Sequence, residues 1–358
     1  MSRVDRLTAL AAERELDVLL VNDPVNLRYV TGFTGTNGLA LVGADAEGVR
    51  RFVTDFRYLE RADHEVEGFE VVRGERDLLE SVPAALPDRR PLRLGFDDAH
   101  VSVRAYRRLG ELLEGVELVP SGGLVERLRA VKEPAELERI RAAAVLADQA
   151  LEAALARGLA GRTERQVALD VEDEMRRRGA EPGFPTIVAA GPQGALPHAD
   201  AREVEIPRDT LVIVDWGGRV DGYCSDCTRT FATGEVDGEA REVYELVARA
   251  QLAGLQAVRA GVTGRDADAA ARALIDESGR GEQFGHGLGH GVGLEVHEGP
   301  RLAKTGGDEP LAAGNVVTVE PGVYVPGRFG VRVEDLVVVT AEGTEVLSST
   351  SKDLVALD

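Results

Sequence analysis

The 358-residue sequence is poor in cysteine, in aromatic side chains and in positive charge. Its two cysteines cannot form the disulfide framework of a small secreted domain. An aromatic content of 4% indicates no distinctive specificity pocket. A net charge of −20 argues against a sequence-independent grip on nucleic acid or an anionic membrane, because either requires a basic face. No apolar run approaches a membrane span, and the N-terminus lacks the apolar core of a secretion signal. We therefore expect a cytoplasmic protein that binds neither nucleic acid nor membrane.

The two cysteines, Cys224 and Cys227, form a Cys-x-x-Cys pair, a spacing that also occurs in zinc sites and redox sites. Zinc would require two further soft ligands nearby, and a thioredoxin-like site would require the pair to open a helix after a strand. Here the pair lies inside an apparent strand. We expect both to be packing residues.

The chain is longer than one hydrophobic core usually organises, which predicts two domains. Helical and strand patterns alternate in the N-terminal third, where residues 26–38 are rich in turn formers and no metal-ligand cluster is evident. Pro134 suits the first turn of a long helix. We place the boundary near Lys132, giving predicted domains 1–131 and 132–358. The predicted N-terminal elements are a helix over 3–14 and strands over 17–21, 39–42, 49–54, 69–72, 92–95 and 116–119.

The functional interpretation begins with residues 211–230. Leu211–Val214 is typical of a buried strand, glycines follow, and a run rich in Tyr, Thr and Phe favours the return strand of a hairpin. Asp215 and Asp226 would then lie side by side, one on each strand. Two carboxylates held together in a core repel each other unless they share a proton or a cation. The alternative is that both are surface residues in a turn.

Two glutamates and four histidines belong to the same domain. Glu320 and Glu334 lie in apolar strand patterns (316–324 and 331–339), and a buried carboxylate usually has a cation or hydrogen-bond partner. Arg332 could be that partner for either glutamate, and on a strand it would share one side with Glu334. The histidines lie in segments flanked by Gly or Pro: His198, His286, His290 and His297.

One set of side chains stands out as a possible metal site: Asp215, Asp226, His290, Glu320 and Glu334. Four carboxylates and one imidazole carry too much negative charge for one zinc ion but suit two divalent cations with bridging carboxylates. Oxygen-rich ligation favours harder ions such as Mn²⁺, while Co²⁺, Fe²⁺ and Zn²⁺ remain open. A pair of metals about 3.5–4 Å apart can activate water and polarise a carbonyl.

As a set, these motifs resemble the pita-bread metallopeptidases, which are methionine aminopeptidase, aminopeptidase P and prolidase. The N-terminal third resembles the creatinase/prolidase N-terminal domain, which points to the Xaa-Pro branch. The resemblance implies an α/β (α+β) fold, with a creatinase-like N-terminal domain before a pita-bread catalytic domain. The matching stretches are Tyr29–Phe33, Asp215-x-Gly217, Ser225–Thr230, Gly289–Gly293, Glu320–Gly322 and Arg332–Glu334.

The resemblance also implies a role for each metal-ligand position. Asp215 would chelate one metal and His290 with Glu320 the other, while Asp226 and Glu334 would bridge them. Glu320 would also carry the proton of the attacking water. Thr228 is expected to orient Asp226, because metal ligands commonly need such support.

Further positions match residues that contact the substrate or stabilise charge at the tetrahedral centre. These are His198, His286 and His297, with Arg332 and Tyr324 as a supporting arginine and tyrosine, Tyr324 also being expected to bind substrate. Arg301 resembles an arginine of prolidase that would hold the free carboxylate of a proline dipeptide.

The implied reaction is hydrolysis of the peptide bond before proline, in a proline-containing dipeptide or oligopeptide. We favour a dipeptidase (prolidase), with an Xaa-Pro aminopeptidase acting on longer peptides as the alternative. A pita-bread domain used for binding without catalysis is a further reading, disfavoured because no ligand position is missing. The resemblance also implies a homodimer.

Overall fold

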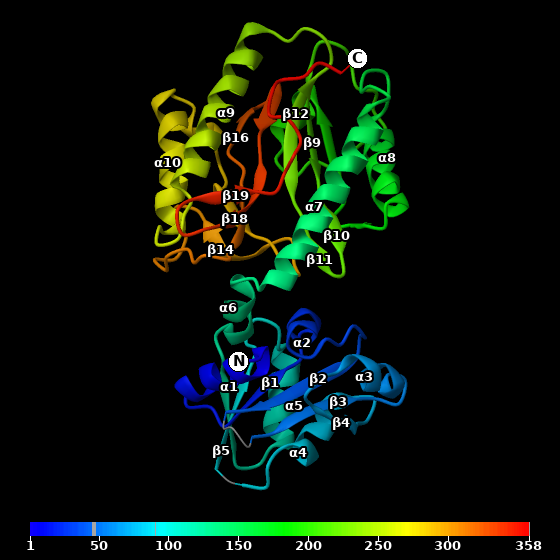
Figure 1. Cartoon of the computed structure of the whole chain (residues 1–358), viewed down its shortest axis with the longest axis vertical. Coiled ribbons are helices and arrows are strands. Elements are labelled where there is room, and N and C mark those ends of the chain that lie inside the picture. Colours follow the sequence, from blue (N-terminus) through cyan, green and yellow to red (C-terminus); the bar gives the residue numbers. More distant parts are fainter. Residues whose placement is uncertain (45–47, 90, 358) are drawn as a thin grey trace. The chain divides into compact units, whose positions relative to one another are not determined.

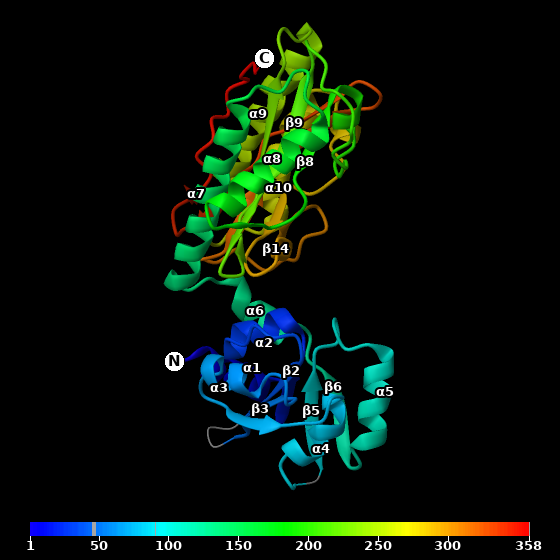
Figure 2. The ribbon, with the colours of Figure 1, turned by 90° about the vertical axis from the view of Figure 1, so that its right-hand side faces the viewer.

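The computed structural model describes residues 1–44, 48–89 and 91–357, and the chain divides into two compact units, Met1–Arg129 and Ala130–Asp358 (Figure 1, and Figure 2 from the side). Among the described residues, no helix is both long enough and apolar enough to cross a membrane.

The first unit is built on a six-stranded mixed sheet with strand order β4-β3-β2-β1-β5-β6. Strand β1 pairs antiparallel with β2 and parallel with β5, and the buried residues between sheet and helices are mainly Leu and Val. The strands are β1 (Val18–Val21), β2 (Gly38–Gly43), β3 (Arg50–Thr54), β4 (Glu70–Arg73), β5 (Leu92–Phe96) and β6 (Val116–Pro120). The helices are α1 (Arg3–Glu13), α2 (Pro24–Thr31), α3 (Leu59–Glu65), α4 (Val82–Ala85), α5 (Val103–Leu112) and α6 (Leu124–Ala130), with the short 3₁₀ helix η1 (Leu78–Ser81).

Helix α2 corrects the prediction of a turn-rich segment over 26–38. The Asp23 side chain accepts hydrogen bonds from the backbone N–H groups of Val25 and Asn26, and Pro24 occupies the first turn. Gly32 ends the helix with a φ of 83°, a left-handed conformation that favours glycine. These start and stop signals outweigh the turn-forming composition of the segment.

The second unit packs two helix pairs, α7 with α8 and α9 with α10, against its sheets. Strands β12-β9-β8 form one sheet and β14-β13-β15-β18-β19 another, while β16 pairs with β17 and β11-β10-β7 form a small third sheet. The helices are α7 (Pro134–Leu155), α8 (Glu164–Arg177), α9 (Gly238–Ala257) and α10 (Gly264–Glu277), with the 3₁₀ helices η2 (Gly191–Ala195) and η3 (Gly281–Gln283). The strands are β7 (Glu181–Pro182), β8 (Ile187–Ala190), β9 (Leu211–Trp216), β10 (Gly218–Val220), β11 (Tyr223–Cys224), β12 (Cys227–Ala232), β13 (Gly289–Gly291), β14 (Glu298–Leu302), β15 (Val316–Val319), β16 (Gly322–Val325), β17 (Phe329–Arg332), β18 (Asp335–Val339) and β19 (Thr344–Val346).

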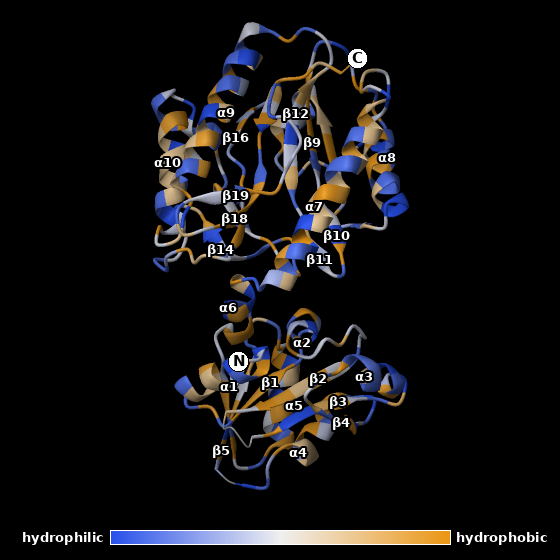
Figure 3. Cartoon of the chain, in the orientation of Figure 1, coloured by the Kyte–Doolittle hydropathy of each residue, from blue (hydrophilic) through white to orange (hydrophobic). Residues whose placement is uncertain are grey.

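The apolar side chains of this unit gather into two main cores, one under each helix pair. Figure 3 shows hydrophobic and hydrophilic stretches alternating along α7 to α10, as expected for helices with one buried face. Both helix pairs thus hold the central strands in fixed positions, and those strands carry the polar residues described next.

Candidate metal centre

All five predicted metal ligands line one pocket of about 440 Å³ in the second unit. Asp215 lies on β9 and His290 on β13, whereas Asp226 lies just before β12. Glu320 lies between β15 and β16, and Glu334 between β17 and β18. The structure therefore brings together residues that are far apart in the sequence.

The two glutamates occupy breaks in what the sequence indicated to be continuous strands over 316–324 and 331–339. Strand β15 pairs with β18 in the five-stranded sheet, whereas β16 pairs only with β17 in a separate ribbon. Glu320-Pro321 leaves the first sheet and Val333-Glu334 returns to it. Proline supplies no N–H to a ladder, which accounts for the break at Pro321. The carboxylates sit where the chain changes sheets.

The aspartate hairpin also differs from its prediction. The small hairpin of β10 and β11 is inserted between β9 and β12, and the residue opposite Asp215 is Thr228. Asp226 precedes the paired part of β12. The two cysteines belong to separate strands, and both are buried and form no disulfide. Burial raises the pKa of Cys224 to about 11 and that of Cys227 well above its usual range, which disfavours thiolate chemistry at either residue.

His290 is oriented with one ring nitrogen toward the carboxylates. Its Nδ1 donates to the carbonyl oxygen of Gly291 at 3.1 Å, which leaves Nε2 for a cation. Nε2 lies 3.2 Å from Glu320 Oε1 and 3.7 Å from Asp226 Oδ2. One ligand atom each from Asp226, His290 and Glu334 lies within 4.8 Å of the others. This is a compact donor set of oxygens and one nitrogen.

The pKa values of the buried carboxylates indicate a site that needs positive charge. Burial, reinforced by neighbouring carboxylates, raises the pKa of Asp226 and of Glu334 well above the usual range, and burial also raises that of Asp215. Burial alone would raise the pKa of Glu320, but the hydrogen bond with His290 and the nearby positive charges of His290, His286 and Arg332 together outweigh burial and lower the pKa to about 2. Asp215 Oδ1 is buried and has no hydrogen-bond partner among the described residues. A divalent cation would relieve both the repulsion and this unsatisfied oxygen.

The buried side chain of Arg332 donates hydrogen bonds to three side chains in and beside the cluster. Arg332 donates to Asp215 Oδ2 at 2.6 Å, to the hydroxyl of Thr228 at 3.0 Å and to that of Tyr324 at 3.0 Å. The alternative in which Arg332 pairs with Glu320 or Glu334 is wrong, because its ion pair is with Asp215. Thr228 donates to Glu334 Oε2 at 2.6 Å, so it orients Glu334 rather than Asp226 as predicted.

His286 and Tyr324 belong to the same network. His286 Nδ1 donates to the carbonyl oxygen of Gly287 at 2.7 Å, and Nε2 accepts from the hydroxyl of Tyr324 at 2.8 Å. Burial lowers the pKa of His286, which keeps the ring neutral. Both ring nitrogens are thus engaged in hydrogen bonds within the protein. Tyr324 is buried and lies outside the described pocket lining.

The remaining predicted substrate residues are exposed. His198 and His297 line the pocket, and the His297 ring centroid lies 4.2 Å from that of His290. Desolvation and the charge of His290 lower the pKa of His297. Arg301 lies on β14, outside the described pocket lining, although its charge acts on His297.

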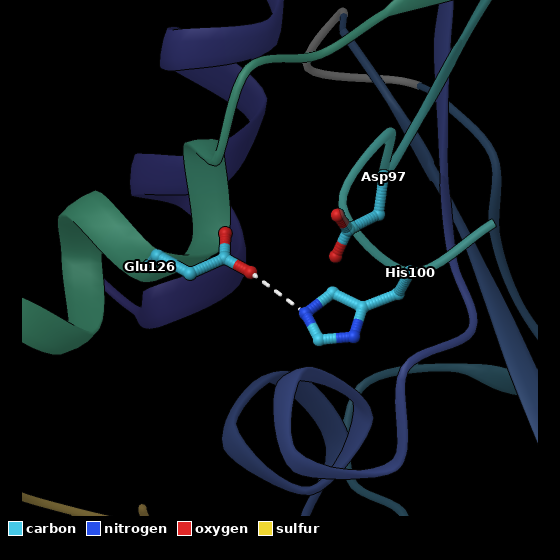
Figure 4. A group of neighbouring side chains, drawn as sticks. All are labelled: Asp97, His100 and Glu126. Carbon is cyan, nitrogen blue, oxygen red and sulfur yellow. Dashed lines mark ion pairs between the residues drawn. The ribbon is translucent and has the colours of Figure 1, made fainter. Parts of the chain in front are cut away.

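A second group of metal-ligand residues lies in the first unit, where none was predicted. Asp97, His100 and Glu126 offer ligand atoms within 4.8 Å of one another, as Figure 4 shows. The Asn26 amide donates to Asp97 Oδ2 at 2.8 Å and to Glu126 Oε1 at 2.6 Å, and Arg129 donates to Asn26 Oδ1 at 2.8 Å. The sequence gives no sign of this group because Glu126 is remote from Asp97 and His100.

Comparison with known proteins identifies the family. A model of metallopeptidase family M24 matches residues 138–341, and one of the creatinase/prolidase N-terminal domain matches residues 3–131. An Xaa-Pro dipeptidase of Pyrococcus furiosus is 34% identical, over 98% of this chain and 99% of that protein.

Two solved structures cover almost the whole chain. An Xaa-Pro dipeptidase from Bacillus anthracis has a TM-score of 0.93 and 39% identity, covering 99% of both chains. An X-Pro aminopeptidase from Thermotoga maritima has a TM-score of 0.89 and 35% identity, covering 99% of this chain and 100% of that one. These matches confirm the predicted fold class, a creatinase-like N-terminal domain with a pita-bread domain. The chain therefore belongs to metallopeptidase family M24, whose members use divalent metal ions.

Proposed function

We propose that this protein hydrolyses the peptide bond before proline in Xaa-Pro dipeptides, using two divalent cations. The observation that carries the proposal is the pocket-lining cluster of four carboxylates and His290, in which Asp215 Oδ1 has no described partner. The compared proteins support the substrate class, since they are two Xaa-Pro dipeptidases and an X-Pro aminopeptidase.

The donor set fits two cations. Two divalent ions carry as much positive charge as the four carboxylates carry negative charge, and the oxygen-rich set favours Mn²⁺, with Co²⁺, Fe²⁺ or Zn²⁺ as alternatives. Five residues would hold these ions: Asp215, Asp226, His290, Glu320 and Glu334. Such ions, when bound, polarise the scissile carbonyl and lower the pKa of water toward about 7.

The side chains of the protein would then position the substrate and move protons. Glu320 holds a proton from the attacking water and delivers it to the proline nitrogen. The exposed imidazoles of His198 and His297 face the pocket and donate to the developing oxyanion, where hydrogen-bond donors have their largest effect. His286, Tyr324 and Arg332 hold the cluster in place through the hydrogen bonds described above.

The pocket also suits an apolar substrate. Phe184, Pro185, Ile187 and Val296 contribute apolar surface beside the cluster. A proline ring and an apolar neighbouring side chain would bury surface there. Arg301 remains our candidate for the substrate carboxylate, reached by a side-chain movement from β14.

The test is incubation of the Mn²⁺-loaded protein with Leu-Pro and with Leu-Pro-Ala. Cleavage of Leu-Pro with little cleavage of Leu-Pro-Ala supports a dipeptidase, and Arg301→Ala should then raise the KM for Leu-Pro. The reverse preference supports the alternative, an Xaa-Pro aminopeptidase, and removes the role of Arg301. Cleavage of neither peptide with Mn²⁺, Co²⁺ or Zn²⁺ would support a non-catalytic binding protein, for which metal analysis should find no bound ions.

Three further assignments accompany this proposal. Residues 1–131 are taken as the creatinase-like domain and 132–358 as the catalytic domain. A homodimer is proposed and can be checked by light scattering in solution. The cytoplasmic location stays a prediction.

A further inference from the structure

We propose that Arg229 is a positioning residue of the metal centre and fixes the orientation of the Glu334 side chain. It does so as part of a charge network with Asp335 and Lys352. This inference rests on the proposed function and extends it to side chains outside the described pocket lining. Arg229 belongs to the matching stretch Ser225–Thr230, and neither the proposed ligand set nor the proposed proton transfer uses it.

The Arg229 guanidinium connects the two chain segments whose side chains meet at one metal ligand. Its side chain is 1% exposed. It donates to the backbone carbonyl oxygen of Thr228 at 2.9 Å and also to that of Glu334. The Thr228 hydroxyl in turn donates to the Glu334 carboxylate. One guanidinium therefore holds the backbone of both the donor and the acceptor of the hydrogen bond that orients this ligand.

Asp335 follows Glu334 directly and faces the other way. Consecutive side chains of an extended chain point to opposite sides. Glu334 accordingly lines the pocket, whereas the Asp335 side chain is 1% exposed and its Oδ1 accepts from Arg229 at 2.8 Å. Because the two residues share a peptide unit, a fixed Asp335 limits the rotations that are open to Glu334.

A segment near the C-terminus completes this buried ion pair. Such a pair stabilises a fold only when other hydrogen bonds satisfy its remaining atoms. The carbonyl oxygens of Thr350 and Ser351 accept from Arg229 Nε at 3.0 and 3.1 Å, and Thr350 also accepts from Nη2 at 2.7 Å. Asp335 Oδ2 accepts from Lys352 Nζ at 2.6 Å. The segment thus supplies acceptors for the arginine and a second cation for the aspartate.

The same segment is itself held in place beside β12 (Figure 1). The backbone N–H of Ala232 donates to the carbonyl oxygen of Val355 at 2.9 Å, and that of Leu357 donates to Ala232 at 2.8 Å. The Tyr244 hydroxyl donates to the carbonyl oxygen of Lys352 at 2.8 Å. The Lys352 side chain is 37% exposed, so a substitution there changes the network without opening the buried core.

The experiment measures Mn²⁺ binding to the metal-free protein by calorimetry, together with Leu-Pro cleavage and urea unfolding. Lys352→Met removes the second cation and Lys352→Arg retains it, whereas Arg229→Lys keeps the charge but loses the planar fork of donors. Lys304→Met is the matched control, because Lys304 is an exposed lysine outside the described pocket lining. Asp170→Asn is the stability control, because it removes an ion pair with Arg162 of 2.5 Å in the same unit, on α8.

We expect Lys352→Met to raise the apparent Kd for Mn²⁺ about tenfold and Arg229→Lys to raise it about a hundredfold, as for lost support of a metal ligand. The kcat for Leu-Pro should fall at limiting Mn²⁺ and recover at saturating Mn²⁺. The KM should change less than about twofold, since the substituted side chains do not belong to the described lining. Lys352→Arg should keep the Kd within about twofold of the wild-type value.

The proposal is overturned if Lys352→Met lowers stability as Asp170→Asn does but binds Mn²⁺ as the wild type does. It is also overturned if Lys304→Met weakens Mn²⁺ binding as much as Lys352→Met. If Arg229→Lys does not fold, the two Lys352 variants decide. If the wild type binds Mn²⁺ but cleaves neither Leu-Pro nor Leu-Pro-Ala, the proposed function fails, and the comparison of Kd values still tests the positioning role. A wild type that binds no Mn²⁺ contradicts both.

Discussion

The two groups of metal-ligand residues in this chain differ in whether their carboxylate oxygens accept hydrogen bonds from other side chains. In the first unit, the Asn26 amide donates to both Asp97 and Glu126, and Arg129 in turn holds Asn26. In the second unit, Asp215 Oδ1 is buried without a described partner, and no described hydrogen bond reaches the Asp226 carboxylate. Both groups contain carboxylates and one histidine at similar separations.

Closeness of ligand-type residues is therefore not what distinguishes a metal centre. Buried polar groups in native proteins are satisfied, and in the first unit the Asn26 amide, itself held by Arg129, donates to both carboxylates. In the second unit, Asp215 Oδ1 and the Asp226 carboxylate accept no described hydrogen bond, so these carboxylates need either protons or cations. The comparison favours a catalytic metal site in the second unit and a structural network in the first.

The largest expected effect comes from neutralising a carboxylate in the second unit. Glu320→Gln should fold but lower the kcat for Leu-Pro at least about a thousandfold, because it removes a metal ligand and the proton carrier together. Glu126→Gln is the matched change in the first unit and should leave kcat within about twofold. Initial rates with Mn²⁺, together with metal content by mass spectrometry, check both. Near-normal turnover by Glu320→Gln would contradict the assignment.

A smaller loss is expected at Thr228. Its hydroxyl connects Arg332 to Glu334, so Thr228→Val should reduce kcat about 10–100-fold through a misaligned ligand. Thr228→Ser retains the hydroxyl and should recover most of the activity. If serine and valine gave the same loss, packing rather than the hydrogen bond would be responsible.

The sequence predicts which residues gather in the pocket better than it predicts the local structure around them. Strand periodicity does not show where a chain passes from one sheet to another. Residues 316–324 and 331–339 therefore have the pattern of single strands, although Glu320 and Glu334 interrupt them. The partner of Thr228 depends on strand register, which sets Thr228 opposite Asp215 and near Glu334. The group around Asp97 depends on contacts between distant segments, and no local sequence pattern predicts it. By contrast, the start of α2 has a local signal in Asp23-Pro24, although the turn-forming composition of residues 26–38 led us to expect turns there.

A moderate loss of stability should follow from breaking the amide bridge in the first unit. Asn26→Ala leaves Asp97 Oδ2 and Glu126 Oε1 without the amide donor that bridges them, and we expect the free energy of unfolding to fall by about 1–3 kcal/mol. Asn22→Ala is the control, because Asn22 Oδ1 has no described hydrogen bond to lose. Urea unfolding checks both. An equal cost for the two variants would mean that the amide of Asn26 does not bridge the carboxylates.

The smallest effect tests the repulsion within the same group. Burial, and next the charge of Glu126, raises the pKa of Asp97, so ionised Asp97 disfavours the folded state at any pH above its folded pKa. Glu126→Gln keeps the oxygen that accepts from Asn26 and removes the charge, and should stabilise the protein by a few tenths of a kcal/mol at pH 7.5. The gain should disappear near pH 4, where carboxylates become protonated in folded and unfolded chains alike. Urea unfolding at the two pH values measures it, and a gain of equal size at both would mean that the substitution acts through packing and not through charge.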